Sequence, residues 1–192
     1  MKELKFKSLK PLLSVFFITL LFIGCESPPE KAIVSNDSNY EIASADYSNL
    51  SVKALTDLTN FQFDSWGSIL ADDVEFYFPD GDAGTRTKLS GKSSVVDWWK
   101  NWKETSGVQS MTFTDNVNIP IIAKEKSAYT GLAGVMVISY FSNEIVYQEG
   151  SVKLRMNFVA HFNEENLIDR YYTYYDRSGI IELMKKNILD SE

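Results

Sequence analysis

Two β-rich runs near the end of the chain, separated by a short polar turn, constrain the fold most strongly. Residues 152–162 alternate between apolar and polar side chains, the period-2 pattern of a strand with one apolar face. The apolar positions are Leu154, Met156, Phe158, Ala160 and Phe162, and the polar ones are Lys153, Arg155, Asn157 and His161. The polar residues 163–166 lead directly into a second run, residues 167–176, so the sequence predicts a hairpin. Its apolar face must be covered by helices from elsewhere in the chain.

The N-terminus has the pattern of a secretory signal peptide. Lysines at positions 2, 5, 7 and 10 precede an apolar run over residues 11–23, too short for a membrane span of about 20 residues. The small Gly24 then precedes Cys25, the only cysteine of the chain, and this junction resembles a bacterial lipobox. We therefore expect residues 1–24 to be a lipoprotein signal peptide, with Cys25 lipidated and the chain anchored to a bacterial membrane in the cell envelope, periplasmic or surface-facing. The alternative is a soluble secreted protein with an incidental cysteine.

The rest of the chain predicts a tether and one acidic domain. Residues 25–44 are polar and rich in Pro, Ser and Asn, as in a flexible linker, and residues 45–192 have the length of one ordinary domain. Beyond residue 24 there are 15 basic residues (19 − 4) and 25 acidic residues (26 − 1), a net charge near −10. Such a charge repels phosphate backbones, so nucleic acid is not expected as a partner.

The elements ahead of the hairpin read as helices followed by strands. Apolar residues recur at helical spacing over residues 45–70, with a break expected near Asn60. A short strand follows and stops at Pro79. The next helix opens after Gly91, with Ser93 or Ser94 as its N-cap, and places Val95, Trp98, Trp99 and Trp102 on one stripe. Residues 111–120 and 128–141 read as strands, and residues 178–188 as a closing helix with Ile180, Ile181 and Leu183 on its apolar side.

This order of elements resembles the nuclear-transport-factor-2-like, or SnoaL-like, cone-fold superfamily. The resemblance covers about residues 45–188 and is carried by residues 69–76 entering a strand, Gly91 before the third helix, Phe162-Asn163 at the turn, and the strand end at Tyr174-Tyr175-Asp176. It implies an α+β, cone-shaped fold in which a curved antiparallel sheet packs against three N-terminal helices, with a short closing C-terminal helix. It also implies a mostly apolar pocket and, in many members, a homodimer through the sheet face. The same fold serves enzymes, binding proteins and assembly modules.

The resemblance can be tested against the ketosteroid isomerases, which use a carboxylate base and an oxyanion hole of a tyrosine and a protonated aspartate. Alignment on the quoted motifs places the base at Phe78, the oxyanion aspartate at Phe158 and the tyrosine at Ala54. All three positions are apolar, so isomerase chemistry of that kind is not expected.

Two residues remain as catalytic candidates. His161 is the only histidine and lies on the strand face opposite Met156 and Phe158, facing solvent or a dimer partner. Asp176 is either a general acid at the pocket mouth or a cap of the closing helix through the N–H of Ser178 or Gly179. A single histidine argues against a histidine-based metal site, and we predict neither a metal nor a cofactor.

The sequence thus favours a lipid-anchored domain that binds a small apolar or amphipathic molecule in an aromatic pocket. The pocket residues expected are Trp66, Phe76, Phe78, Trp98, Trp99, Met156, Phe158, Tyr171 and Tyr175. Two alternatives stay open: a SnoaL-like cyclase, isomerase or dehydratase acting on a hydrophobic substrate through Asp176 or a tyrosine, and a dimeric interaction module without ligand.

Overall fold

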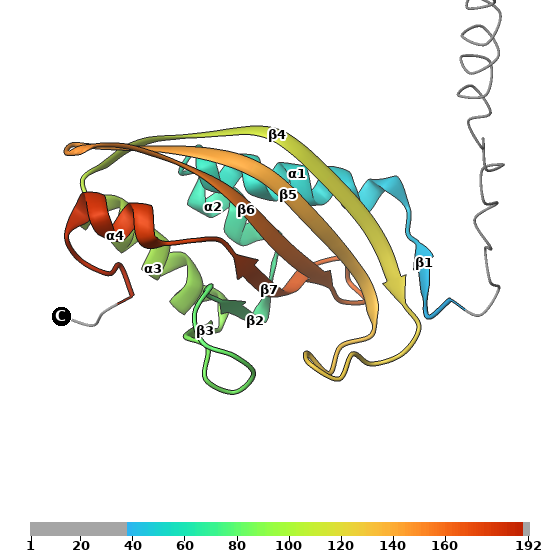
Figure 1. Cartoon of the computed structure of the whole chain (residues 1–192). Coiled ribbons are helices and arrows are strands. Elements are labelled where there is room, and N and C mark those ends of the chain that lie inside the picture. The colour runs from blue at the N-terminus through green and yellow to red at the C-terminus, as the bar shows by residue number, and fades with distance from the viewer. Residues whose placement is uncertain (1–37, 190–192) are drawn as a thin grey trace, which may run out of the picture. The chain divides into compact units, whose positions relative to one another are not determined.

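In the computed structural model, residues 38–189 are described, and they form one sheet with helices packed against it (Figure 1). The helices are α1 (Ala45–Thr59), α2 (Phe63–Ser68), α3 (Lys92–Thr105) and α4 (Ser178–Met184). The strands are β1 (Tyr40–Ile42), β2 (Leu70–Tyr77), β3 (Lys88–Ser90), β4 (Val108–Ala123), β5 (Gly134–Tyr147), β6 (Gly150–Phe162) and β7 (Ile168–Tyr174). The predicted α+β class, with three N-terminal helices and a short closing helix, is confirmed.

The seven strands lie in the order β1-β4-β5-β6-β7-β2-β3. Neighbouring strands are antiparallel except β2 and β7, which run parallel, so the sheet is mostly rather than wholly antiparallel. The long strands β4, β5 and β6 curve over α1, α2 and α3, as Figure 1 shows. This curvature gives the sheet an inner face against the helices and an outer face away from them.

The predicted hairpin is confirmed as β6 and β7. Asn163 closes its turn, because the side-chain oxygen accepts hydrogen bonds from the backbone N–H groups of Glu165 (3.1 Å) and Leu167 (2.9 Å). Asn166 takes the left-handed conformation that the turn needs, with φ of 59°. The turn residues therefore fix the register that places Phe158 and Ala160 on the inner face.

The predicted helix break is confirmed, whereas the cap predicted for α3 is wrong. Helix α1 starts at Ser44, whose side chain accepts from the N–H of Asp46, and the chain turns at Phe61, which has φ of 58°. Helix α3 instead follows Gly91, whose φ of 86° suits glycine, without a side-chain cap. Ser93 and Ser94 are inside the first turn of that helix.

Two short strands were not expected. β1 lies within the stretch read as a tether and pairs with the end of β4, so ordered structure begins before Ala45. β3 pairs with β2 at the other edge of the sheet. The predicted signal peptide and Cys25 lie outside the described residues. Among residues 38–189, no helix has the length and apolar character that a membrane span requires.

The core lies between the inner face of the sheet and the helices. It is unusually aromatic: Trp66, Phe76 and Tyr171 are each at most 2 % exposed and pack against one another through ring contacts. Tyr171 and Thr173 of β7 face inward, while Tyr174 lies 42 % exposed on the outer face. Since the described residues bury a continuous core of their own, they constitute a domain that can fold without the segment before it.

Candidate functional site

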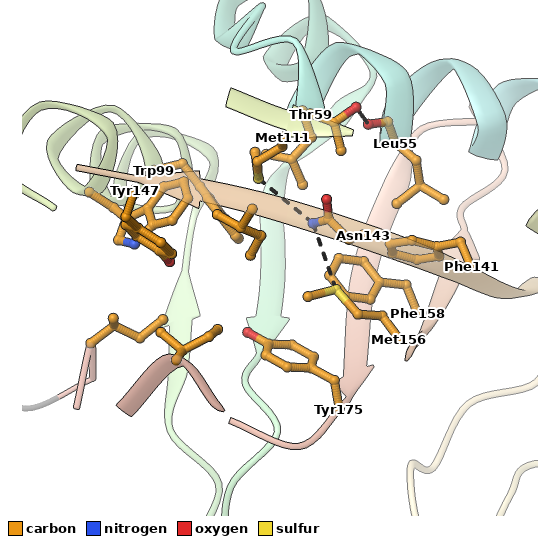
Figure 2. Close-up of a pocket in the computed structure, with 15 residues that line it drawn as sticks. Leu55, Thr59, Trp99, Met111, Phe141, Asn143, Tyr147, Met156, Phe158 and Tyr175 are labelled. Carbon is orange, nitrogen blue, oxygen red and sulfur yellow. Dashed lines mark hydrogen bonds between the residues drawn. The ribbon is translucent and has the colours of Figure 1, made fainter. Parts of the chain in front are cut away.

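A cavity lies between the inner face of the sheet, helices α1 and α3, and the C-terminal segment (Figure 2). It is lined by Leu55, Leu58, Thr59, Trp99, Trp102, Met111, Phe141, Asn143, Ile145, Tyr147, Met156, Phe158, Tyr175, Ile180 and Ile188. The space open to the centres of water-sized molecules is about 30 Å³, enough for two or three waters at roughly 10–15 Å³ each. Side chains therefore fill most of the cone.

Four of the predicted pocket residues line this cavity, namely Trp99, Met156, Phe158 and Tyr175. The other five are Trp66, Phe76, Phe78, Trp98 and Tyr171, and they pack in the adjoining aromatic core. Trp99 joins the two groups, because its ring contacts Phe76 at 5.8 Å and Trp102 at 5.3 Å between centroids. The sequence therefore indicated that all nine residues lie on the inner side of the sheet. It could not show which of them line the cavity and which pack in the core.

Asn143 and Tyr147 are cavity residues that sequence reasoning missed. The predicted strand ended at Phe141, whereas β5 continues to Tyr147 and points every second side chain inward. Continuing the alternation from Phe141 would have identified both residues. Figure 2 shows the amide nitrogen of Asn143 directed at the sulfur atoms of Met111 (3.8 Å) and Met156 (3.9 Å). The side-chain oxygen of Asn143 has no partner among residues 38–189.

Both tyrosines of the cavity are held in the neutral form. Burial raises the pKa of Tyr147, and the nearby Tyr175 hydroxyl raises it further. Burial likewise raises the pKa of Tyr175. Each phenol therefore remains an O–H donor at neutral pH, and neither is suited to act as a base there.

Known structures share this arrangement of elements. A protein of unknown function from Burkholderia pseudomallei, described as NTF2-like, superposes with a TM-score of 0.55 at 14% identity, over 74% of this chain and 100% of that one. The fold is NTF2-like. A candidate polyketide cyclase from Silicibacter sp. TM1040 superposes with a TM-score of 0.56 at 15% identity, over 74% of this chain and 98% of its own.

A third structure of the NTF2-like fold was solved with a ligand. It is a hypothetical protein from Catenulispora acidiphila with a ketosteroid isomerase-like fold, in complex with trimethylamine. It superposes with a TM-score of 0.50 at 12% identity, over 74% of this chain and 97% of that one. At these identities the likeness establishes the fold alone. No protein-family model matches the sequence, and no curated protein does either.

Within this NTF2-like fold, the three positions compared with ketosteroid isomerases are buried apolar side chains. Ala54, Phe78 and Phe158 are 0 %, 1 % and 4 % exposed. Phe158 lines the cavity, while Ala54 and Phe78 are packed in the core. None of these side chains can exchange a proton with a ligand.

His161 lies on the outer face, as predicted, but it is buried rather than open to solvent. Its ring nitrogens bond to the Asp169 carboxylate (Nδ1 to Oδ1, 2.5 Å) and to the Ala133 carbonyl (Nε2 to O, 2.9 Å). Only 8 % of the residue is exposed. The sheet separates it from the cavity, because neighbouring residues of a strand point to opposite faces.

Asp176 accepts a hydrogen bond from the first residue of the closing helix α4. Its Oδ1 accepts a hydrogen bond from the N–H of Ser178 at 2.8 Å, and this bond holds the pKa of the carboxyl below its usual range. The side chain is exposed and does not line the cavity.

Ile181, which the sequence placed on the apolar side of this helix, is also exposed. Among residues 38–189, no group of three His, Cys, Asp or Glu side chains is placed to hold a metal.

Proposed function

We propose that this domain binds a small, largely apolar molecule in the cavity between the sheet and helices α1 and α3. The observation that carries the proposal is the wall itself, which combines aromatic and aliphatic side chains with several buried polar atoms that have no hydrogen-bond partner among residues 38–189. That combination is typical of small-molecule sites, where apolar area supplies affinity and a few polar groups fix orientation.

Binding is favoured over turnover by where the ionisable groups lie. His161 is on the outer face and Asp176 caps α4, so neither sequence-based catalytic candidate reaches the cavity. The phenols that do line it, Tyr147 and Tyr175, are kept neutral by burial. General acid–base catalysis needs a group whose pKa lies near the working pH.

The C-terminal segment is the part of the wall through which a ligand would enter. It contributes Tyr175, Ile180 and Ile188, whereas the rest of the wall belongs to long strands and helices. Helix α4 has seven residues and approaches β6 closely at Gly179, where a Cβ atom would lie 3.0 Å from Val152 Cγ2. Because a ligand larger than about three waters exceeds the present 30 Å³, this short helix must move to admit it.

The proposal extends to the location of the domain. Cys25 would carry the lipid that anchors the chain to a bacterial membrane, and residues 26–37 would connect it to the domain in the cell envelope. The support is the lipobox-like junction after an apolar run.

The experiment is native mass spectrometry of residues 26–192 purified from cells without denaturation, followed by organic extraction of whatever is released. The expected result is an additional mass at up to one equivalent per chain, which names the ligand class. Protein of bare mass, together with no thermal shift across a panel of small hydrophobic molecules, would refute the proposal.

A second candidate is a homodimer through the sheet face, and a separate observation favours it. Six large apolar side chains on the outer face are 39–77 % exposed: Tyr40, Ile42, Val117, Ile119, Tyr140 and Tyr174. Cross-strand pairing places Val117 directly opposite Tyr140 on this face, and clustered exposed apolar side chains mark interaction surfaces. Light scattering should give a dimer mass that Ile119→Glu halves, while the control Asn101→Glu, at an exposed position of α3 on the helix side of the sheet, leaves it unchanged. A monomer mass for the unaltered protein contradicts the dimer.

A further inference from the structure

Four side chains of the cavity each hold a polar atom without a hydrogen-bond partner in residues 38–189. They are the Nε1 atoms of Trp99 and Trp102, the Oδ1 of Asn143 and the hydroxyl of Tyr147. Each residue is more than nine-tenths buried, with exposed fractions from 2 % to 7 %. Folded proteins leave few buried polar atoms unpaired, since each costs about 1–3 kcal/mol. Four of the seven such atoms in residues 38–189 belong to residues that line this one small cavity, which points to an occupant that pairs with them.

Their chemistry defines what the occupant must offer. An indole N–H only donates, and the phenol of Tyr147, kept neutral by burial, is also a donor. Asn143 turns its amide nitrogen to Met111 and Met156, which leaves its oxygen as an acceptor. Thr59, another polar side chain of the wall, already donates to the Leu55 carbonyl at 2.9 Å. With the Tyr175 hydroxyl, the wall thus offers four donors and the Asn143 oxygen as an acceptor, which suits a ligand with a carbonyl or hydroxyl oxygen.

The absence of charged side chains from the cavity wall narrows the class of ligand further. None of the 15 lining side chains is Asp, Glu, Lys, Arg or His. A carboxylate or ammonium group would enter this wall without a counter-charge, and burying an unpaired charge is far more costly than burying a neutral polar group.

We infer that the cavity selects a neutral ligand whose oxygen accepts hydrogen bonds from Tyr147 and from an indole N–H of Trp99 or Trp102, and that it rejects the corresponding carboxylate. This inference rests on the proposed function. It distinguishes this cavity from a site for a carboxylate, because a buried carboxylate is usually paired with a cation.

The test uses three ring compounds of nearly equal size, with residues 26–192 and calorimetry or ligand-observed NMR. Acetophenone supplies a neutral carbonyl, benzoate a carboxylate and ethylbenzene no polar group. Acetophenone should bind at least about tenfold more tightly than benzoate. Tyr147→Phe should weaken acetophenone about 5- to 10-fold and leave ethylbenzene unchanged, because only one hydrogen bond to the ligand is lost.

The variant Tyr147→Phe removes an unpaired hydroxyl from the interior, so it keeps the fold. Tyr171→Phe is the matched control, since Tyr171 is equally buried but does not line the cavity. Equal binding of benzoate and acetophenone, or no effect of Tyr147→Phe, overturns the inference while the binding function stands. If none of the three compounds binds, the proposed function fails as well.

Discussion

His161 should make the stability of this domain fall as the pH rises through the neutral range. Both of its ring nitrogens face acceptors, the Asp169 carboxylate and the Ala133 carbonyl, so only the doubly protonated imidazolium can make both bonds. Burial lowers the pKa of His161, but the bond to Asp169, the bond to the Ala133 carbonyl and the charge of Asp169 raise it by more, against a small lowering by Arg170. The folded-state pKa is therefore above the unfolded value of about 6.5.

The sign of the effect follows from that ordering. A raised pKa means that folding favours the protonated imidazole, so its stabilisation is fully present below about pH 6.5 and is lost as the pH passes the folded-state pKa. Deprotonation removes one hydrogen bond that involves a charged group, which is typically worth about 1.5–3 kcal/mol. We expect the lower value, about 1.5 kcal/mol, because 17 % of the Asp169 side chain is exposed to solvent. Solvent screens the interaction between Asp169 and His161.

The assay is urea unfolding of the unaltered protein and His161→Gln between pH 5.5 and 9, followed by tryptophan fluorescence. With a urea slope near 2 kcal/mol/M, the midpoint difference between the two proteins should shrink by about 0.7 M across this range. Asp169→Asn should flatten the dependence as well. A midpoint difference that stays constant from pH 5.5 to 9 would refute the reasoning.

Three further changes give separate tests. Phe158→Ala should lower the free energy of unfolding by about 3 kcal/mol or more and weaken ligand binding, because it removes a buried ring from the cavity wall; urea unfolding and calorimetry check this. Gly179→Val should displace α4 from Val152 and speed limited proteolysis near the C-terminus, while Glu182→Ala on the same helix should not, and equal cleavage rates would contradict the tight contact. Cys25→Ser should abolish fatty-acid labelling of the chain in bacteria, and labelling that persists would exclude Cys25 as the lipidated residue.

Local patterns in the sequence predicted much of this fold. Strict alternation in residues 152–162 predicted β6, its inner face and the hairpin, because a strand with one buried face must repeat every second residue. The helical spacing before Asn60 likewise gave α1 and the break after it. The three-residue strands β1 and β3 could not be predicted, because they are too short to show the alternation of apolar and polar residues.

The site was harder to predict than the fold, because it depends on distant contacts. Alternation places Phe158 and Tyr171 each on the buried face of its strand, but it cannot show which of them packs in the filled core and which lines the cavity. The burial of His161 depends on Asp169 and Ala133, and Ala133 is 28 positions away in sequence. The importance of Asn143 depends on two methionines from other strands.

The strand order has a consequence for how the chain folds. Strands β2 and β3 join the sheet only through β7, and Thr173 bonds to the Tyr77 carbonyl across 96 positions. The sheet therefore cannot close until the last strand is available, and closing so long a loop costs entropy before any contact repays it. A nascent chain lacking residues 168–174 leaves β2 with no strand to join on that side. Folding of this domain accordingly waits until β7 has been synthesised, and the high contact order predicts a refolding time of milliseconds to seconds rather than microseconds.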